Sequence, residues 1–138
     1  MKKLLCALVI GFLSFGSSAQ TYLQINGVSI HDHSGFNNVN YGGGLEQTVS
    51  DNWNLAAGWY RNSEWHGSTY GYARYSFYQS DKWNLGVGIG VVTGYTVMRV
   101  LPMAFPEACY SYVCAIALPK VEDTGANVLG FHLRIPLN

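Results

Sequence analysis

Bulky apolar residues alternate with small or polar ones along most of the chain, which is the two-residue period of a β-strand with two unlike faces. Residues 83–91, WNLGVGIGV, put large side chains on one face and asparagine and glycine on the other. Turn-forming residues separate such runs. The pattern predicts eight strands, at about 21–31, 38–48, 53–61, 68–78, 83–95, 99–108, 113–119 and 127–137.

Two of these runs are near copies of one another. SDNWNLAAGWY begins at Ser50 and SDKWNLGVGIG begins at Ser80, which is the spacing of two strands and two connections in an up-and-down meander. We therefore expect an all-β fold, an eight-stranded antiparallel up-and-down β-barrel. Its short turns would lie at 49–52, 79–82 and 109–112. Its other connections, at the opposite end, would be 32–37, 62–67, 96–98 and 120–126.

The composition of the two faces favours a transmembrane barrel. A globular sandwich would bury its bulky face and expose a polar one, but the second face of residues 83–91 is mostly glycine, which packs and solvates poorly. Ten tyrosines, four tryptophans and sixteen glycines with only 12% charged residues suit a barrel whose large side chains face lipid and whose aromatic residues form girdles.

The first 19 residues, MKKLLCALVIGFLSFGSSA, have the features of a secretory signal peptide: two lysines, an apolar run and small residues before the cleavage site. The apolar run is short for a transmembrane helix. Cleavage would remove Cys6 and leave one domain, residues 20–138. We therefore expect export to a bacterial outer membrane, with the short turns on the periplasmic side.

The residues that would point into the barrel differ between its two ends. Near the short turns they are polar, with Gln24, Asn26, Asn54 and Asn84 beside the plug residues Glu46, Arg74, His132 and Arg134. Glu46 would pair with one of the two arginines, because buried charges need partners. Near the other end we predict a narrow apolar well lined by Val28, Ile30, Gly58, Gly88 and Gly90. Such a barrel has room for side chains or one small ligand, not for a water channel.

Cys109 and Cys114 are separated by four residues, and in an oxidising compartment such a pair forms a disulfide across a hairpin. A metal site is the alternative, but the sequence offers no further ligands near the thiols, so we expect no metal and no other cofactor. Without the signal peptide the chain has six basic and eight acidic residues and no basic stripe, which argues against nucleic acid as a partner.

The last third of the chain resembles a known family. RVLPMAFPEACYSYVCAIALPKVEDTGANVLGFHLRIPL, with Pro102, Pro119 and the loop at 125–127, is similar to the end of the lipid A palmitoyltransferases, the PagP family. Upstream, FNNVNYGGGLE resembles the family's triple-glycine strand and LGVGIGVVTG its glycine-rich fifth strand. The resemblance implies a monomeric outer-membrane barrel that moves a palmitoyl chain from a phospholipid to lipid A.

The prolines bear on how that family admits its acyl donor. Proline donates no hydrogen bond to a sheet, so Pro102 on the sixth strand and Pro119 on the seventh would weaken the pairing of these neighbours. The resemblance implies that a lipid tail enters sideways through this gap. A strand end or a bulge at each proline is the alternative interpretation, and Pro106 fits either.

The family's active residues are a histidine near the outer end of the first strand and an adjacent Asp-Ser in the second outer loop. The stretch YRNS matches this motif in its serine, Ser63, but has Asn62 in place of the aspartate, and an amide cannot take a proton. No histidine matches in register. His31, His33 and His66 are therefore all candidates for the base that activates the serine.

We expect a lipid-handling barrel that transfers a fatty acyl chain from phospholipid to lipid A. The alternative is a non-catalytic lipid-binding or structural barrel, in which His31, Asp32, His33 and the loop at 60–68 form only a polar rim facing lipopolysaccharide. An adhesin or phage-interaction barrel is less well supported, because adhesion surfaces usually need longer loops. A lipid A deacylase would need a His-x-Ser arrangement that is not found at His132.

Overall fold

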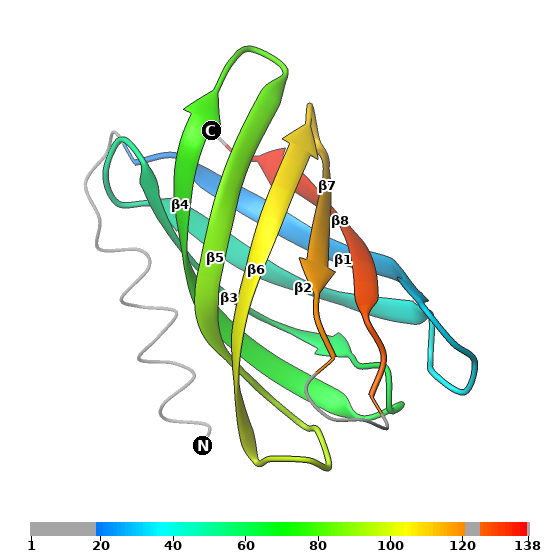
Figure 1. Cartoon of the computed structure of the whole chain (residues 1–138). Helices are drawn as coiled ribbons and strands as arrows, with labels where there is room; N and C mark the ends of the chain where they lie inside the picture. The colour runs from blue at the N-terminus through cyan, green and yellow to red at the C-terminus, as the bar shows by residue number, and fades with distance from the viewer. Residues whose placement is uncertain (1–18, 121–124, 138) are drawn as a thin grey trace.

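The chain folds into a closed eight-stranded antiparallel barrel (Figure 1). The computed structural model describes residues 19–120 and 125–137. The strands are β1 (Thr21–His31), β2 (Val39–Thr48), β3 (Trp53–Arg61), β4 (Gly67–Gln79), β5 (Trp83–Thr93), β6 (Val100–Tyr110), β7 (Val113–Leu118) and β8 (Val128–Pro136). Each strand pairs with its neighbours in sequence, and β8 pairs with β1. The predicted fold is confirmed, with strand boundaries that differ by two residues at most.

The predicted signal peptide, residues 1–19, lies outside the described residues except for its last position. Four residues of the predicted loop at 120–126 also lie outside them. Among the described residues, no helix has the length and apolar character that a membrane-spanning helix needs.

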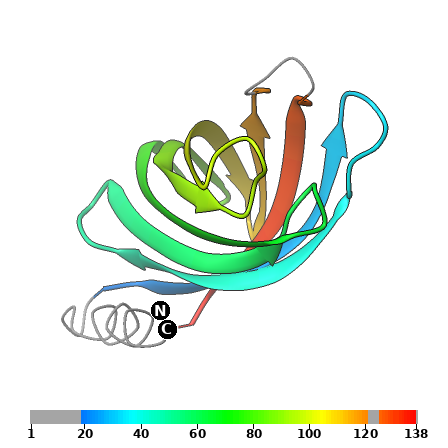
Figure 2. The same cartoon turned by 90° about the horizontal axis from the view of Figure 1, so that it is seen from below.

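The two ends of the barrel differ in their connections. Short turns at 49–52, 80–82 and 111–112 lie at one end, which we call the turn end. Both ends of the described chain lie there too, since the Leu137 amide donates to the Thr21 carbonyl at 2.9 Å. The loops at 32–38, 62–66 and 94–99 lie at the other end, which we call the loop end (Figure 2).

The outer surface of the barrel is apolar. On β5 the side chains of Val87, Ile89 and Val91 are 47%, 64% and 46% exposed, as the alternation predicted. Aromatic side chains gather toward both ends of this surface. The ring pairs are Trp53 with Tyr75 and Trp83 with Tyr110 near the turn end, and Tyr41 with Trp59 nearer the loop end.

Glycines face the interior, but aromatic rings cover them. A Cβ atom on Gly88 would lie 2.3 Å from the ring of Phe105, and one on Gly58 would lie 2.5 Å from the Tyr70 hydroxyl. A Cβ on Gly90 would be equally close to atoms of Tyr72. The prediction that these glycines line the narrow apolar well is therefore wrong. They make room for the rings, and the rings form the wall.

A bulge at Gly27 reverses the faces of β1. The register with both β2 and β8 shifts between Asn26 and Val28. An extra residue in one strand turns every later side chain to the opposite face. Val28 and Ile30, predicted to line the interior, are instead 52% and 60% exposed, and Ser29 is buried. The prediction for these two side chains is wrong, although atoms of Val28 still contribute to the cavity wall.

The ladder between β6 and β7 stops early. It joins four residue pairs, from Tyr110 opposite Val113 to Glu107 opposite Ile116. By contrast, β6 pairs with β5 along its whole length. Beyond Glu107, in the part of the chain that the structure describes, β6 has no partner on its β7 side. The barrel wall is thus incomplete toward the loop end.

The directions of the backbone N–H groups explain where this ladder stops. The Ser111 N–H donates to the Lys82 carbonyl on the β5 side, and the Arg134 N–H donates to the Tyr112 carbonyl. Because these directions alternate along a regular strand, even-numbered residues of β6 point their N–H groups toward β7. Odd-numbered residues of β7 point theirs toward β6.

Prolines occupy the next positions of this ladder. After Ala108, the hydrogen-bonding positions due in the same register are Pro106, opposite Ala117, and Ala104, opposite Pro119. Each of these pairs lacks one N–H, because proline has none. The gap therefore follows from one proline on each side. We call this stretch, where β6 and the end of β7 run side by side without pairing, the seam.

Candidate functional site

An apolar cavity, which we call the inner cavity, occupies the loop-end half of the barrel. It measures about 780 Å³ with its open mouth included. Aromatic and aliphatic residues form most of its lining, among them Tyr60, Tyr70, Tyr72, Tyr95, Met103, Phe105, Ile116, Leu118 and Val128. A narrow apolar interior was predicted toward this end, and the cavity lies there with a different lining.

Polar side chains close the floor of the inner cavity. The Gln24 amide donates to the Tyr72 hydroxyl at 2.6 Å and to Glu46 at 2.9 Å, and its oxygen accepts from the Tyr70 hydroxyl at 2.8 Å. Gln24 is 1% exposed. These bonds fix the depth of the cavity, because a fully bonded buried amide resists displacement.

A second cavity adjoins the first at the gap in the wall, and we call it the seam cavity. Its lining includes Pro102, Met103 and Ala104 of β6 together with Leu118 and Pro119. It shares with the inner cavity the residues His31, Tyr60, Ser63, Tyr95, Met103, Leu118 and Val128. Both sides of the proline gap therefore border a space that leads to the rim of the inner cavity.

His31 reaches this rim because of the bulge. As the last residue of β1 it follows the same parity as Ser29, and it lines both cavities. Its Nδ1 lies 2.6 Å from the Asn38 Oδ1. Its Nε2 is enclosed and has no hydrogen-bond partner among the described residues. An imidazole held at one nitrogen with the other unpartnered beside a cavity has the arrangement of a general base.

Ser63 lines both cavities as well. Its backbone carbonyl accepts from the Asn37 backbone N–H at 2.8 Å, which ties the loop at 62–66 to the loop after β1. Tyr95 lines both cavities too, and its hydroxyl lies 2.9 Å from the Tyr60 hydroxyl. The structure therefore brings a serine, a histidine and two phenols to one rim.

The Asn62 side chain is buried and holds the loop at 62–66 in place through hydrogen bonds. It is 0% exposed. Its amide nitrogen donates to the Ser68 Oγ and to the Gly94 carbonyl, both at 2.9 Å. Its oxygen accepts the backbone N–H groups of Glu64 and His66, also at 2.9 Å. Asn62 therefore positions Ser63 through the backbone, and its side chain does not line either cavity.

The other two candidate histidines lie outside the cavities. His33 contacts Asp32 at 2.7 Å, and its side chain is 49% exposed. The side chain of His66 is 56% exposed, with its Nδ1 3.8 Å from Glu64. A hydrogen bond from Asn127 lowers the pKa of Asp32, with a smaller contribution from His33. Of the three histidines, His31 is the one that lines the same cavities as Ser63.

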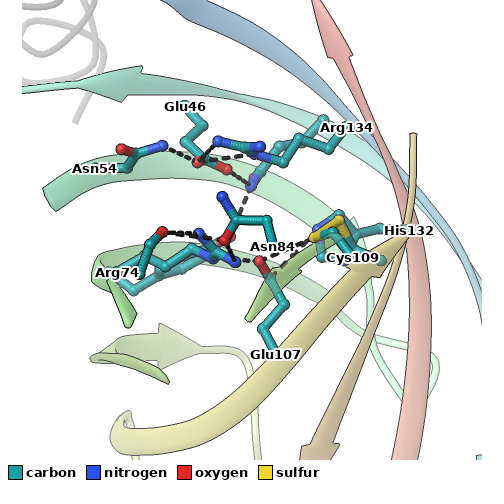
Figure 3. The surroundings of a disulfide bond; sticks show 12 residues. Glu46, Asn54, Arg74, Asn84, Glu107, Cys109, His132 and Arg134 are labelled. Carbon is teal, nitrogen blue, oxygen red and sulfur yellow. Dashed lines mark hydrogen bonds and ion pairs between the residues drawn. A yellow bond between two sulfur atoms is a disulfide. The ribbon is translucent and has the colours of Figure 1, made fainter. Parts of the chain in front are cut away.

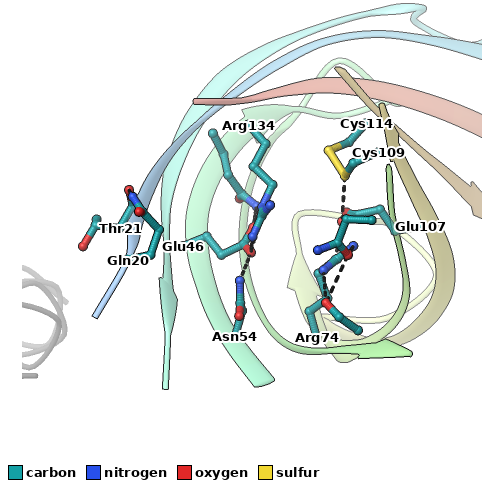
Figure 4. A network of polar contacts seen from close by, with 12 residues as sticks. Gln20, Thr21, Glu46, Asn54, Arg74, Glu107, Cys109, Cys114 and Arg134 are labelled. Atoms are coloured by element: carbon teal, nitrogen blue, oxygen red, sulfur yellow. Dashed lines mark hydrogen bonds and ion pairs between the residues drawn. A yellow bond between two sulfur atoms is a disulfide. The ribbon is translucent and has the colours of Figure 1, made fainter. Parts of the chain in front are cut away.

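The polar plug fills the turn-end half, as predicted (Figure 4). Glu46 binds Arg134 at 2.8 Å, which is one of the two predicted pairings. Arg74 instead pairs with Glu107, a residue that sequence analysis did not single out, and both of these side chains are 0% exposed. The two-residue period of a strand, followed back from Cys109, places Glu107 inside the barrel. It does not show that Glu107 pairs with Arg74.

Cys109 and Cys114 form the predicted disulfide, inside the turn end. No ligands were predicted near these two residues, but Glu107 and His132 lie beside the sulfur atoms (Figure 3). His132 is opposite Cys114 in the β7–β8 register. This neighbourhood depends on strand pairing, which a count along one strand does not give.

No protein-family model matches the chain, and comparison with curated proteins finds no match.

Proposed function

We propose that this protein is an outer-membrane barrel that binds a lipid acyl chain in the inner cavity and transfers it to lipid A. The observation that carries the proposal is the joining of three features in one place. An apolar cavity ends on a polar floor, its rim carries His31 and Ser63, and the seam between β6 and β7 opens beside that rim.

The outer surface supports a membrane location. Exposed valine, leucine and isoleucine side chains on a closed barrel would be a liability in water, whereas lipid solvates them. Aromatic pairs toward both ends match the girdles that sit at membrane interfaces. The loop end then faces outward if the turns face the periplasm.

The proline seam supports sideways entry of the lipid. Backbone groups cannot remain unpaired against hydrocarbon without cost, so a gap in a membrane barrel needs a reason. At this gap proline removes one N–H donor from each of the two pairs, which lowers that cost. An acyl chain could pass between Ala104 and Leu118 without breaking a ladder hydrogen bond.

The proposed chemistry uses the rim residues. His31 Nε2 takes the Ser63 hydroxyl proton as Ser63 Oγ bonds to the ester carbonyl carbon of the phospholipid. The ester C–O bond then breaks, and the lysophospholipid alkoxide leaves with that proton. A lipid A hydroxyl attacks the acyl-serine next, and its proton passes through His31 back to Ser63.

One observation favours the non-catalytic alternative. The Asn62 side chain spends its hydrogen bonds on its own loop, on Ser68 of β4 and on Gly94 of the neighbouring loop, and it lines neither cavity. A barrel that only binds lipid would need the cavity and the seam. It would not need an acidic residue to act with His31 and Ser63.

Mass spectrometry of lipid A separates these functions. Cells that make the natural protein should contain lipid A heavier by one acyl chain, and cells that make Ser63→Ala should not. Unchanged lipid A in both strains, with lipid co-purifying in the barrel, would establish the binding function instead. A trypsin-sensitive soluble product without heat-modifiable gel mobility would refute the membrane barrel.

A further inference from the structure

Four side chains with metal-binding atoms converge inside the turn end (Figure 3). Cys109 is opposite Cys114 in the β6–β7 register, and Cys114 is opposite His132 in the β7–β8 register. Glu107 precedes Cys109 by two residues and so shares its face. The donor atoms of Glu107, Cys114 and His132 all lie within 4.8 Å of one another.

Two of these donor atoms are enclosed and unused. His132 Nε2 and Glu107 Oε2 lie 3.5 Å apart, with side chains only 8% and 0% exposed. Neither atom has a hydrogen-bond partner among the described residues. Burying polar atoms without partners is costly, and a cation between these two would satisfy both at once.

The spacing of the donor atoms suits a tetrahedral ion. With zinc–sulfur bonds of about 2.3 Å and zinc–nitrogen or zinc–oxygen bonds of about 2.0 Å, neighbouring ligand atoms lie about 3.3–3.8 Å apart. The His132 Nε2 to Glu107 Oε2 distance of 3.5 Å falls in this range, as does the 3.4 Å between Cys109 Sγ and Glu107 Oε1. The disulfide keeps the set from binding an ion, because sulfur atoms bonded to each other are not thiolates.

We propose that reducing the Cys109–Cys114 disulfide converts this cluster into a zinc site with both cysteines, His132 and Glu107 as ligands. A dithiol reductant supplies two electrons and two protons, breaks the S–S bond and itself becomes a disulfide. Each protein thiol then loses its proton as its sulfur binds the ion, so two protons are released for each zinc bound.

The charges around the site balance when zinc is bound. Two thiolates and the Glu107 carboxylate carry three negative charges, and the ion with Arg74, which already pairs with Glu107, carries three positive ones. A neutral cluster is the arrangement that a buried, low-dielectric interior tolerates best. Two soft sulfur ligands with one nitrogen and one oxygen select zinc over magnesium or calcium.

The test is to fold the purified full chain from denaturant into detergent micelles, with a phosphine reductant and either zinc or cobalt(II), and to remove unbound metal by gel filtration. We expect about one zinc per reduced chain. The cobalt form should have thiolate-to-metal charge-transfer bands. Oxidised protein should bind neither ion at this site.

Cys109→Ser with Cys114→Ser should remove binding, and His132→Gln or Glu107→Gln should weaken it at least tenfold. Asp51→Asn, an exposed turn-end change, is the matched control.

Several outcomes would overturn the proposal. One is a reduced, folded barrel that binds no zinc. Another is a cobalt spectrum without thiolate bands, and a third is equal binding by the double serine variant. A reduced chain that fails to fold with zinc as well as without it would overturn the proposal too, whereas folding that requires zinc would support it.

Discussion

Pro106 on β6 and Pro119 just beyond β7 occupy the two successive positions at which the β6–β7 ladder would next form hydrogen bonds. Each proline removes a donor from a different strand. The opening in the barrel wall therefore follows from two backbone positions rather than from general looseness of the barrel. Pro102, on the same strand, lines the seam cavity, but its register partner lies outside the described residues.

Replacing both Pro106 and Pro119 with alanine should close the seam. The change adds two N–H donors, and each new hydrogen bond contributes about 1 kcal/mol. Amide hydrogen exchange at Ala104 and Ala117 should slow by roughly fivefold or more. Pro136→Ala, away from the seam, is the control. Unchanged exchange at both alanines would mean that something other than the prolines keeps the strands apart.

A covalent link across the seam should block lipid entry. Ala104 and Ala117 both face outward, so cysteines there are accessible to a short bifunctional thiol reagent. The crosslinked barrel should no longer take up a fluorescent lipid, and uptake should return when the link is cleaved. The same link between Leu55 and Ala73, which are already paired, should have no effect. Continued uptake by the first crosslinked barrel would rule out this route.

His31 should be the histidine that acts. His31→Gln and Ser63→Ala should each lower the rate of acyl transfer by orders of magnitude, because the reaction needs both the base and the hydroxyl that it activates. His33→Gln and His66→Gln should leave transfer nearly unchanged, since neither ring lines the cavities. The readout is lipid A mass in whole cells. Activity lost with His66→Gln but kept with His31→Gln would contradict this assignment.

Asn62→Asp should not create a better active site. A carboxylate cannot donate to the Ser68 hydroxyl or the Gly94 carbonyl, and it would be buried facing that carbonyl. We expect the loop at 62–66 to loosen, at a cost of about 2–4 kcal/mol. Limited proteolysis of the loop measures this change, with the exposed Asn52→Asp as control. An intact, protected loop in Asn62→Asp would refute the structural role given to the amide.

Removing one partner of the Arg74–Glu107 pair should destabilise the barrel strongly. Both side chains are fully buried, so Glu107→Gln leaves a buried guanidinium short of its charge partner, at a cost of about 3–5 kcal/mol. Replacing both residues with leucine or methionine should recover part of that loss. Urea unfolding in lipid vesicles provides the free energies, and Asp51→Asn gives the baseline. A loss below about 1 kcal/mol would mean that water reaches the pair.

The alternation of residues along a strand predicted which side chains point inward only where the strand has no bulge. The period of two assigned inward and outward faces correctly on β5 and β8, because those strands run without a bulge. It failed on β1 after Asn26, where one extra residue reversed the faces. Gly27 was the available signal, since glycine inside a strand often marks a bulge.

The number of strands, their order, the disulfide and the polar character of the plug could all be predicted from the sequence. These follow from local periodicity and from neighbours along one hairpin, which a linear pattern contains. Three relationships depend on how the strands pair: His31 and Ser63 line the same cavities, Arg74 pairs with Glu107, and His132 lies beside Cys114. Each of these pairs joins separate strands or loops, so its geometry depends on register and closure of the whole barrel, which no local stretch of sequence specifies.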